Sequence, residues 1–119
     1  MGRADVWHAG EDLAAAHLEG LGWQILERNW RCPDGEVDII AVQPGSPPIV
    51  VFCEVKCRRT TTFGQPVEAI TRAKLDKLRH LVQAWLQQFD RPVPSVRLDA
   101  IGVLLAPSGP RINHLRGIG

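Results

Sequence analysis

Two charged residues, Glu54 and Lys56, stand at the end of "IVVFC", an apolar stretch that is typical of a buried β-strand. Side chains two positions apart in a strand point to the same side, so both charges share one face while Cys53 and Val55 share the other. A charge buried in a core strand costs several kcal/mol unless it is paired or bound to a metal. The pattern therefore predicts either an ion pair or a chemical site.

Two further carboxylates break an apolar pattern elsewhere in the chain. Asp38 lies in "GEVDIIAV", which has the character of a second strand, and shares its face with Glu36. Glu11 falls on the apolar side of the first helix, within the series Trp7, Glu11, Ala14 and Leu18 at spacings of four, three and four. We expect Glu11 to point toward the same sheet or toward the rim of a cleft beside it.

Three carboxylates and one lysine can converge from a helix and two adjacent strands. Carboxylate oxygens suit the hard cations Mg²⁺ and Mn²⁺, and one or two of them usually suffice because the ion keeps waters and takes other ligands from a phosphate. The amine of Lys56 would then orient a nucleophile and stabilise negative charge on phosphorus oxygens. The set Glu11, Asp38, Glu54 and Lys56 predicts metal-assisted phosphodiester hydrolysis, with the three acids as metal ligands.

A purely structural alternative exists for the same residues. Glu54 and Lys56 can form a same-face ion pair at a fraying strand end, with Asp38 opposite as a cross-strand partner. An isolated E-x-K favours this alternative, because a three-position pattern is common. A helix glutamate followed by "GEVD" and then by an apolar strand ending in "EVK" is a rarer combination, and it favours the chemical site.

Periodicity and turn signals predict the elements that must position these residues. The Pro-Asp-Gly of "CPDG" joins two strands into a hairpin, and the third strand, apolar on both faces before Glu54, is expected at the centre of the sheet. The last strand is expected at an edge. The predicted order αβββαββ is that of a small α/β sandwich, with helices at 3–19 and from 66 to about 89 and strands at 23–31, 35–42, 49–58, 96–105 and 111–116.

The second helix is predicted to begin at Pro66, because proline suits the first turn of a helix. Residues 59–66, "RTTTFGQP", have the composition of an exposed loop before it. Lys74 interrupts the helix's apolar stripe, which favours a place near the site, although a lysine can bury its stem and leave its amine in water. The stripe consists of Val67, Ile70, Leu78, Val82, Trp85 and Phe89.

Composition supports one domain spanning residues 1–119, with 45% hydrophobic and 23% charged residues. No apolar run is long enough to span a bilayer, and the start of the chain has no apolar signal core, so we expect a cytoplasmic protein without a membrane partner. The three cysteines contain no C-x-x-C pair and argue against a zinc site or a disulfide framework. Cys53 and Cys57 are interpreted as reduced core thiols, and Cys32 is left open.

The aromatic residues and histidines receive structural interpretations. The four tryptophans could serve as base-stacking platforms, but helical and strand spacing favours core positions for Trp7 and Trp85. The four histidines show no ligand spacing with one another and are interpreted as surface or structural residues.

Charge is unevenly distributed along the chain, although the formal net charge is +1. Residues 1–38 contain three basic and eight acidic side chains, and residues 39–119 contain eleven and five. This asymmetry is consistent with a polyanionic partner for one surface. Basic residues in the second half are expected to neutralise phosphates of a nucleic acid without reading its sequence, namely Arg58, Arg59, Arg72, Lys74 and Lys77.

The order of these motifs resembles the PD-(D/E)xK nuclease superfamily, whose αβββαβ core has an acid in the second strand and E-x-K in the third. More closely, the chain resembles the YraN-type family of small bacterial endonuclease-like proteins. The resemblance covers nearly the whole chain, through "GEDLAAAHLEGLGWQILERNWR", "GEVDIIAV", "VFCEVKCR", "FGQPVEAI", "RLDAIGV" and "INHL". It implies a restriction-endonuclease-like α/β fold with a mixed central sheet flanked by helices.

The resemblance also implies residue roles and a substrate. Asp38 and Glu54 would be metal ligands, Lys56 the catalytic lysine, and Glu11 the helix carboxylate also found in Holliday-junction-resolvase-like members. The proline that precedes the superfamily's first acid is absent, and "GEVD" stands in its place. The implied substrate is nucleic acid, most simply DNA, with junctions, flaps, nicks and RNA all open.

Three hypotheses follow. The first is a Mg²⁺- or Mn²⁺-dependent endonuclease acting on structured DNA, with a homodimer that engages two strands as one arrangement. The second is a catalytically inactive nucleic-acid-binding module with the same fold. The third is an interaction scaffold in which the charged cluster is an ion-pair network. Retention of Glu11, Asp38, Glu54 and Lys56 together favours the first, because a module without catalysis has no evident reason to keep all four.

Overall fold

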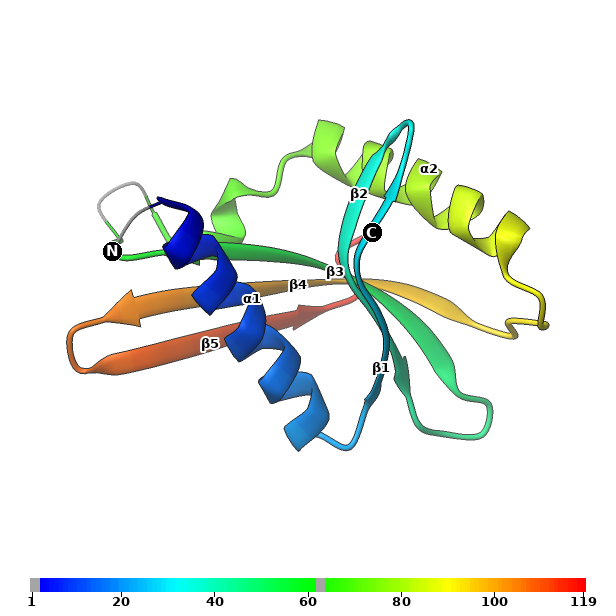
Figure 1. Ribbon diagram of the computed structural model, residues 1–119, viewed down its shortest axis with the longest axis horizontal. Coiled ribbons are helices and arrows are strands. Elements are labelled where there is room, and N and C mark those ends of the chain that lie inside the picture. Colours follow the sequence, from blue (N-terminus) through cyan, green and yellow to red (C-terminus); the bar gives the residue numbers. More distant parts are fainter. Residues whose placement is uncertain (1–2, 62–63) are drawn as a thin grey trace.

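The computed structural model describes residues 3–61 and 64–119. Two helices, a short 3₁₀ segment and five strands follow one another in the predicted order (Figure 1). The mixed α/β class is therefore confirmed. The elements are α1 (Arg3–Gly20), β1 (Gln24–Cys32), β2 (Gly35–Gln43), β3 (Ile49–Arg58), η1 (Pro66–Ala69), α2 (Arg72–Gln88), β4 (Val96–Ala106) and β5 (Gly109–Arg116).

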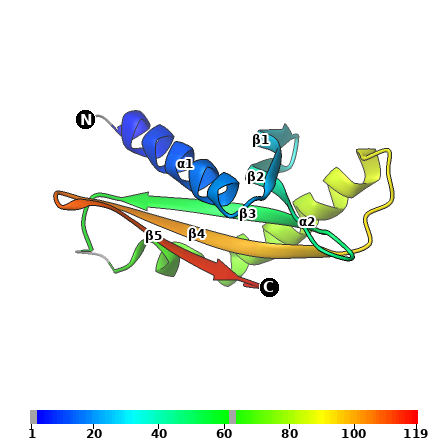
Figure 2. The ribbon, with the colours of Figure 1, turned by 90° about the horizontal axis from the view of Figure 1, so that it is seen from below.

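The five strands form one mixed sheet in the order β1-β2-β3-β4-β5. The β3–β4 pair is parallel and the other three pairs are antiparallel. β3 is central and β5 lies at an edge, as predicted. The parallel pair needs a crossover connection, which η1 and α2 provide. α1 lies on one side of the sheet and α2 on the other (Figure 2).

Each face of the sheet has its own hydrophobic cluster. Alternation along β3 sends Val51, Cys53 and Val55 toward α1, and Val50 and Phe52 toward α2. Glu54 and Lys56 continue the second series and so belong to the α2 side. A central strand with helices on both faces must be apolar in both directions, which explains the unbroken run before Glu54.

The core positions predicted for Trp85 and Trp7 have different outcomes. Trp85 is 1% exposed and packs edge-on against Phe52 in the α2 cluster, so its predicted core position is confirmed. Trp7 is only partly buried and belongs to neither cluster of the described residues. Its predicted core position is wrong.

The second helix begins later than predicted. Pro66 starts the separate 3₁₀ segment η1, and α2 starts at Arg72. Thr71 has an extended backbone and its hydroxyl accepts the Lys74 N–H, which is the geometry of an N-cap. Val67 and Ile70 are therefore outside the helix. Of the loop predicted before Pro66, residues 62 and 63 lie outside the described part of the chain, and its other described residues contain no helix or strand.

The cysteines are free thiols. Cys53 is fully buried, as predicted. Cys57 is only partly buried at the edge of the α1 cluster, so its predicted core position is wrong, and Cys32 is partly exposed. Within the described residues, no helix combines the length and apolar character needed to cross a membrane.

Close packing at Gly10 holds α1 against the end of β3. A Cβ added at Gly10 would lie 2.5 Å from Cys57 Cβ and 2.6 Å from Cys57 Sγ. Glycine therefore permits a helix-to-strand approach that any other residue would widen. The first two turns of α1 are fixed beside Cys57 and hence beside Lys56.

We expect Gly10→Ala to lower the free energy of unfolding by about 1 to 3 kcal/mol, the usual cost of overpacking a close contact. Helix propensity alone predicts the opposite, a gain of up to about 1 kcal/mol. Urea denaturation decides between them, with Gly20→Ala as the control, because nothing lies within 4 Å of a Cβ at Gly20. An increase in stability for Gly10→Ala would show that α1 can move away from Cys57 without cost.

Candidate active site

The site forms where β2 separates from β3. Their regular pairing ends at Ile39 opposite Cys53. Val37 packs in the α2 cluster together with Ile40, although strict alternation would place it with Ile39 on the α1 side. The backbone N–H of Val55, just beyond the last paired position, donates to Asp38 Oδ2 at 2.7 Å. A carboxylate thus replaces the backbone acceptor that the departing strand no longer supplies.

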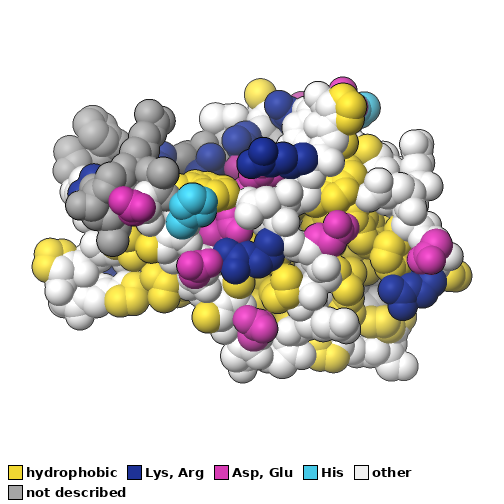
Figure 3. Space-filling view, in the orientation of Figure 1, with side chains coloured by type: hydrophobic (Ala, Val, Ile, Leu, Met, Phe, Trp, Pro, Cys, Tyr) yellow, Lys and Arg dark blue, Asp and Glu magenta, His cyan; other side chains and the backbone are white. Residues whose placement is uncertain are grey.

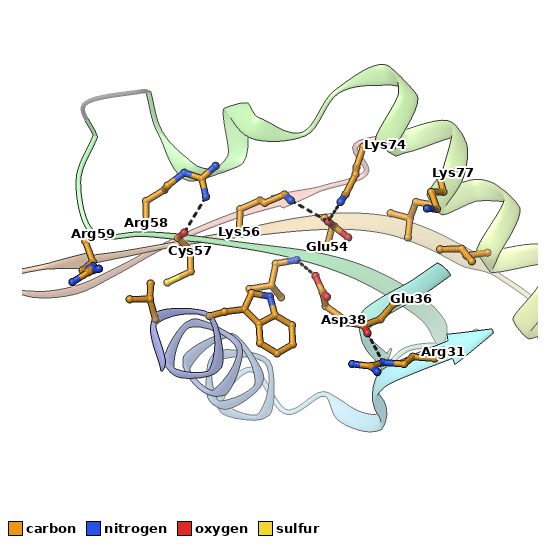
Figure 4. A pocket seen from close by; sticks show the side chains of 15 residues that line it. Arg31, Glu36, Asp38, Glu54, Lys56, Cys57, Arg58, Arg59, Lys74 and Lys77 are labelled. Carbon is orange, nitrogen blue, oxygen red and sulfur yellow. Dashed lines mark hydrogen bonds and ion pairs between the residues drawn. The ribbon is translucent and has the colours of Figure 1, made fainter. Parts of the chain in front are cut away.

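A pocket of about 870 Å³ opens at this point, between the first turns of α1 and the N-terminal half of α2. Asp38 and Glu54 both line it, and each is 7% exposed. Lys56 lines it as well. Asp38, Glu54 and Lys56, predicted from the sequence to act together, therefore do face one space. Figure 4 shows them with the other labelled lining residues.

Glu54 is the meeting point of two lysines. Lys56 Nζ lies 3.5 Å and Lys74 Nζ 3.3 Å from Glu54 Oε1, reaching it from β3 and α2 respectively (Figure 4). The negative charge of Glu54 raises the pKa of Lys74. Lys56 is 22% and Lys74 45% exposed, so both amines sit at the boundary between the buried carboxylate and solvent. The same-face ion pair predicted as the structural alternative is present, with a second cation that the sequence pattern did not pair with Glu54.

Asp38 is held in a setting that opposes its charge. Burial raises its pKa to about 7 from 3.8, and the negative charges of Glu54, Glu36 and Glu11 add to that effect. The hydrogen bond from Val55 acts in the other direction. A carboxyl group poised near neutral pH in a pocket is a recurrent property of functional sites, although ion-pair networks produce it too.

Comparison with known proteins identifies the family of this chain. The family described as "Uncharacterised protein family UPF0102" matches residues 10–103. A UPF0102 protein of Beutenbergia cavernae is 47% identical over 111 residues, which cover 92% of each chain. One from Mycobacterium sp. (strain JLS) is 47% identical over 117 residues, covering 98% of this chain and 86% of its own, and one from Mycobacterium ulcerans is 48% identical over 111 residues, covering 92% and 90%.

The chain belongs to the family UPF0102. The matched range contains Glu11, Asp38, Glu54 and Lys56. The names of these UPF0102 relatives state no activity.

Glu11 does not join the other carboxylates in this UPF0102 chain. It is 1% exposed, and its Oε1 accepts hydrogen bonds from Arg28 Nε at 3.0 Å and Asn29 Nδ2 at 2.8 Å. Glu11 is absent from the described residues that line the pocket. The predicted convergence of three carboxylates is therefore corrected: Glu11 ties α1 to β1, and its charge reaches Asp38 only as the smallest contribution to the pKa of that residue. Its Oε2 is buried without a hydrogen-bond partner among the described residues.

Only some of the basic residues predicted to bind phosphates lie at the pocket of the UPF0102 chain. Arg58, Arg59 and Lys74 line the pocket, whereas Arg72 is exposed and lies outside the described lining. Arg58 donates to the carbonyl of Cys57 at 3.1 Å. In Figure 3 basic side chains gather beside acidic ones near the middle of the face shown.

The pocket of the UPF0102 chain also has lining residues that sequence reasoning did not assign to the site. Arg31 and Glu36 form an ion pair of 2.6 Å at its rim, and Lys77 extends the basic wall of α2. Val6 and Trp7 form an apolar wall on α1. Lys77 was predicted from the sequence as a phosphate contact, and Glu36 was predicted to share a face with Asp38. Trp7 was assigned to the core, while Val6 and Arg31 gave no signal in the sequence.

The donor set bears on the predicted Mg²⁺ or Mn²⁺. Among the described residues, no three His, Cys, Asp or Glu side chains come close enough together to hold an ion. Two carboxylates remain, Asp38 and Glu54, and two are sufficient for Mg²⁺ when waters and a substrate phosphate complete the coordination. Burial and, after it, the negative charge of Glu54 raise the pKa of Asp38, and a divalent cation beside both carboxylates would offset that charge. The donor chemistry of the pair suits such an ion, and Glu11 lies outside the described lining of the pocket.

A fourth buried carboxylate, Asp99, belongs to a separate network in the UPF0102 chain. Asp99 is 0% exposed and accepts hydrogen bonds from Arg97 at 2.7 and 2.9 Å, His114 at 2.8 Å and the Gly117 N–H at 3.1 Å. Burial favours its neutral form, but these donors outweigh burial and hold its pKa at about 2. His17 contacts His114 at 3.1 Å and extends the network to α1. Because the acceptor is well supplied with donors, we interpret this network as structural, in line with the structural role predicted for the histidines.

Proposed function

We propose that this protein is a metal-dependent endonuclease that hydrolyses phosphodiester bonds in structured DNA, built on a PD-(D/E)xK core. The observation that supports this most is the placement of Asp38 and Glu54, two buried carboxylates on strands that separate at that point, with Lys56 on the same face as Glu54. The order α1-β1-β2-β3-α2-β4 agrees with the αβββαβ core that the motif implies.

Each residue has a role in this proposal. Asp38 and Glu54 would hold Mg²⁺ or Mn²⁺, which when bound supplies Lewis-acid polarisation of a phosphoryl oxygen and a more acidic water. The Lys56 ammonium stabilises negative charge that grows on the phosphoryl oxygens. The reduced dielectric constant of the pocket strengthens this electrostatic attraction. Lys74 shares Glu54 with Lys56 and keeps a second cation within reach of the phosphate.

The basic rim would hold the DNA backbone. Arg58 and Arg59 are exposed beside the pocket and are free of a buried carboxylate partner in the described contacts. Contacts of this kind bind phosphates regardless of sequence and make affinity fall with salt. A homodimer that places two such pockets on two strands stays a prediction.

An interaction scaffold is the competing candidate, because Glu54 is already neutralised by two lysines. In that case the charged cluster needs no cation. The scaffold and the inactive binding module both predict that added metal changes nothing, and the scaffold further predicts no binding of nucleic acid.

The test is cleavage of a panel of single-stranded, duplex, nicked, flap and four-way DNA with Mg²⁺ or Mn²⁺, comparing wild type with Asp38→Asn. Glu36→Gln is the matched control, because it removes a carboxylate that lines the same pocket but pairs with Arg31. We expect cleavage of at least one substrate by wild type and Glu36→Gln, and none by Asp38→Asn.

Calorimetric titration with Mn²⁺ supplies a readout independent of substrate choice. We expect binding by wild type and its loss in Asp38→Asn. Equal cleavage by wild type and Asp38→Asn would refute the assignment of the site. Absence of both cleavage and Mn²⁺ binding in the wild type would refute the proposed function in favour of the binding module or the scaffold.

A further inference from the structure

Trp7 differs from the other tryptophans of the chain. Trp23, Trp30 and Trp85 are 6%, 8% and 1% exposed and belong to the two hydrophobic clusters. Trp7 is partly exposed and lines the pocket that contains Asp38 and Glu54. The aromatic contact recorded for its ring is an edge-on one with His8, its neighbour in sequence. The indole of Trp7 therefore faces the pocket and does not fill the hydrophobic core.

The packing of α1 explains why Trp7 faces the pocket. Gly10 brings the helix into direct contact with Cys57, one residue after Lys56. Residues three apart in a helix lie on the same side, so Trp7 is carried to the same end of β3 as Gly10. Val6 lines the pocket next to it. The contact at Gly10 leaves no room for α1 to move closer to the strand, so it sets the closest approach of this wall to β3.

The two helices bring different side chains to the pocket. Val6 and Trp7 on α1 make one wall apolar, while Lys74 and Lys77 on α2 bring cationic charge to the facing wall, which also contains Leu78 and Leu81. The carboxylates of Asp38 and Glu54 lie between them. A ligand that suits both walls carries a flat apolar group at one end and a phosphate at the other, within a space of about 870 Å³. A nucleotide has these two ends.

We propose that Trp7 is a stacking platform for an unpaired base of the DNA strand whose phosphate contacts Lys56 and Lys74. In a duplex, each base is covered on both faces by its neighbours and presents no face to a side chain. Base stacking on an aromatic ring therefore selects single strands or strands that have opened at a flap, junction or frayed end. The inference rests on the proposed function only in so far as a DNA strand is cleaved beside Lys56 and Lys74. The binding of an unpaired base depends on Trp7 alone.

Binding without catalysis tests the inference directly. A thymidine oligonucleotide and a duplex of the same length are titrated into the protein in EDTA, with tryptophan fluorescence and filter binding as readouts. The expected result is quenching of fluorescence by the single strand, because the other three tryptophans are buried. Trp7→Leu should remove the quenching and weaken single-strand binding about tenfold or more, while duplex binding stays within a factor of about two.

Two further variants keep the result interpretable. Trp7→Phe retains a stacking ring and should keep most of the single-strand affinity. His8→Leu alters the exposed neighbour of Trp7 and should leave binding unchanged. The inference is overturned if the oligonucleotide does not quench wild-type fluorescence, if Trp7→Leu binds single strands as tightly as wild type, or if it loses single-strand and duplex binding equally.

Failure of this inference and failure of the proposed function give different results. If the protein cleaves DNA and Trp7→Leu keeps the same KM for single-stranded and flap substrates, the site assignment stands and the role of Trp7 falls. If the wild type cleaves nothing but loses single-strand affinity on Trp7→Leu, the platform stands and the nuclease proposal falls.

Discussion

Glu54→Gln is expected to lower the rate of metal-dependent DNA cleavage by at least about 10³-fold, which corresponds to about 4 kcal/mol of transition-state stabilisation. The substitution preserves the shape of the side chain and removes its charge. A neutral amide is a poor ligand for a hard cation, and it also ceases to hold the amines of Lys56 and Lys74, which now lie 3.5 and 3.3 Å from Glu54 Oε1. Single-turnover cleavage of the best substrate in the panel measures the effect.

The domain should remain folded in the Glu54→Gln variant. Lys56 and Lys74 are 22% and 45% exposed, so each can direct its amine toward water once the carboxylate is gone. Circular dichroism and the urea midpoint provide that check. The two interpretations of the E-x-K pattern then predict opposite outcomes. If Glu54 served only an ion-pair network, the variant would lose stability, and no cleavage activity would depend on it.

Glu36→Gln is again the matched control for Glu54→Gln. Glu36 lines the same pocket but is held by Arg31 at 2.6 Å on its rim. We expect its effect on the cleavage rate to be less than about tenfold, in the range of a side chain that supports rather than performs the chemistry. A loss for Glu36→Gln as large as that for Glu54→Gln would mean that the overall charge of the pocket, and not the position of Glu54, controls cleavage.

The strand carrying Glu54 was predictable from sequence to the residue, because its ends are marked by strong local signals. Proline precedes the apolar run of β3 and charge follows it, so both boundaries, Ile49 and Arg58, agree with the structure. The start of α2 was not predictable from sequence, because two residues each carry a valid signal for the beginning of a helix. Pro66 suits a first helical turn and Thr71 suits an N-cap, and the backbone of Thr71 settles the matter only in the folded chain.

The site shows the same division between local and long-range information. Alternation along β3 correctly puts Glu54 and Lys56 on one face, because that relation involves two residues of one strand. The partner of Glu11 depends on how α1 crosses β1, where Asn29 has a positive φ of 54° and brings its amide beside Arg28. Nothing in the helical pattern around Glu11 could reveal an arginine from another element.

The Asp99 network was accessible to the reasoning that found Glu54. Arg97 and Asp99 are two residues apart in an apolar strand, so they share a face as Glu54 and Lys56 do, and they form a bidentate ion pair. Asp99 and Asp38 differ in how well hydrogen-bond donors stabilise the charged carboxylate. Donors from Arg97, His114 and Gly117 hold the Asp99 pKa at about 2, whereas the pKa of Asp38 is raised to about 7. A buried acid whose pKa is lowered by several hydrogen-bond donors is typical of a structural cluster. A buried acid whose pKa is raised by burial and by neighbouring negative charges is typical of a candidate active site.

Asp38→Asn is expected to stabilise the metal-free protein at pH 8 and to leave its stability nearly unchanged at pH 4. Burial and the charge of Glu54 raise the pKa of Asp38 from 3.8 to about 7. Between these values the folded protein binds a proton that the unfolded chain has lost. The wild type therefore loses stability as pH rises through this window, by roughly 4 kcal/mol at most from this group. Asparagine is neutral throughout and can still accept the Val55 N–H through Oδ1.

Urea denaturation in EDTA at pH 4 and pH 8 measures this difference, with Asp90→Asn as the control. The Asp90 side chain is 90% exposed, so removing its charge should change the free energy of unfolding by less than about 0.5 kcal/mol at either pH. A stability gain for Asp38→Asn that is the same at both pH values would contradict a raised Asp38 pKa. If the same variant gains stability and loses DNA cleavage, the cost of burying this carboxylate is retained for function, as expected of an active site and not of a scaffold.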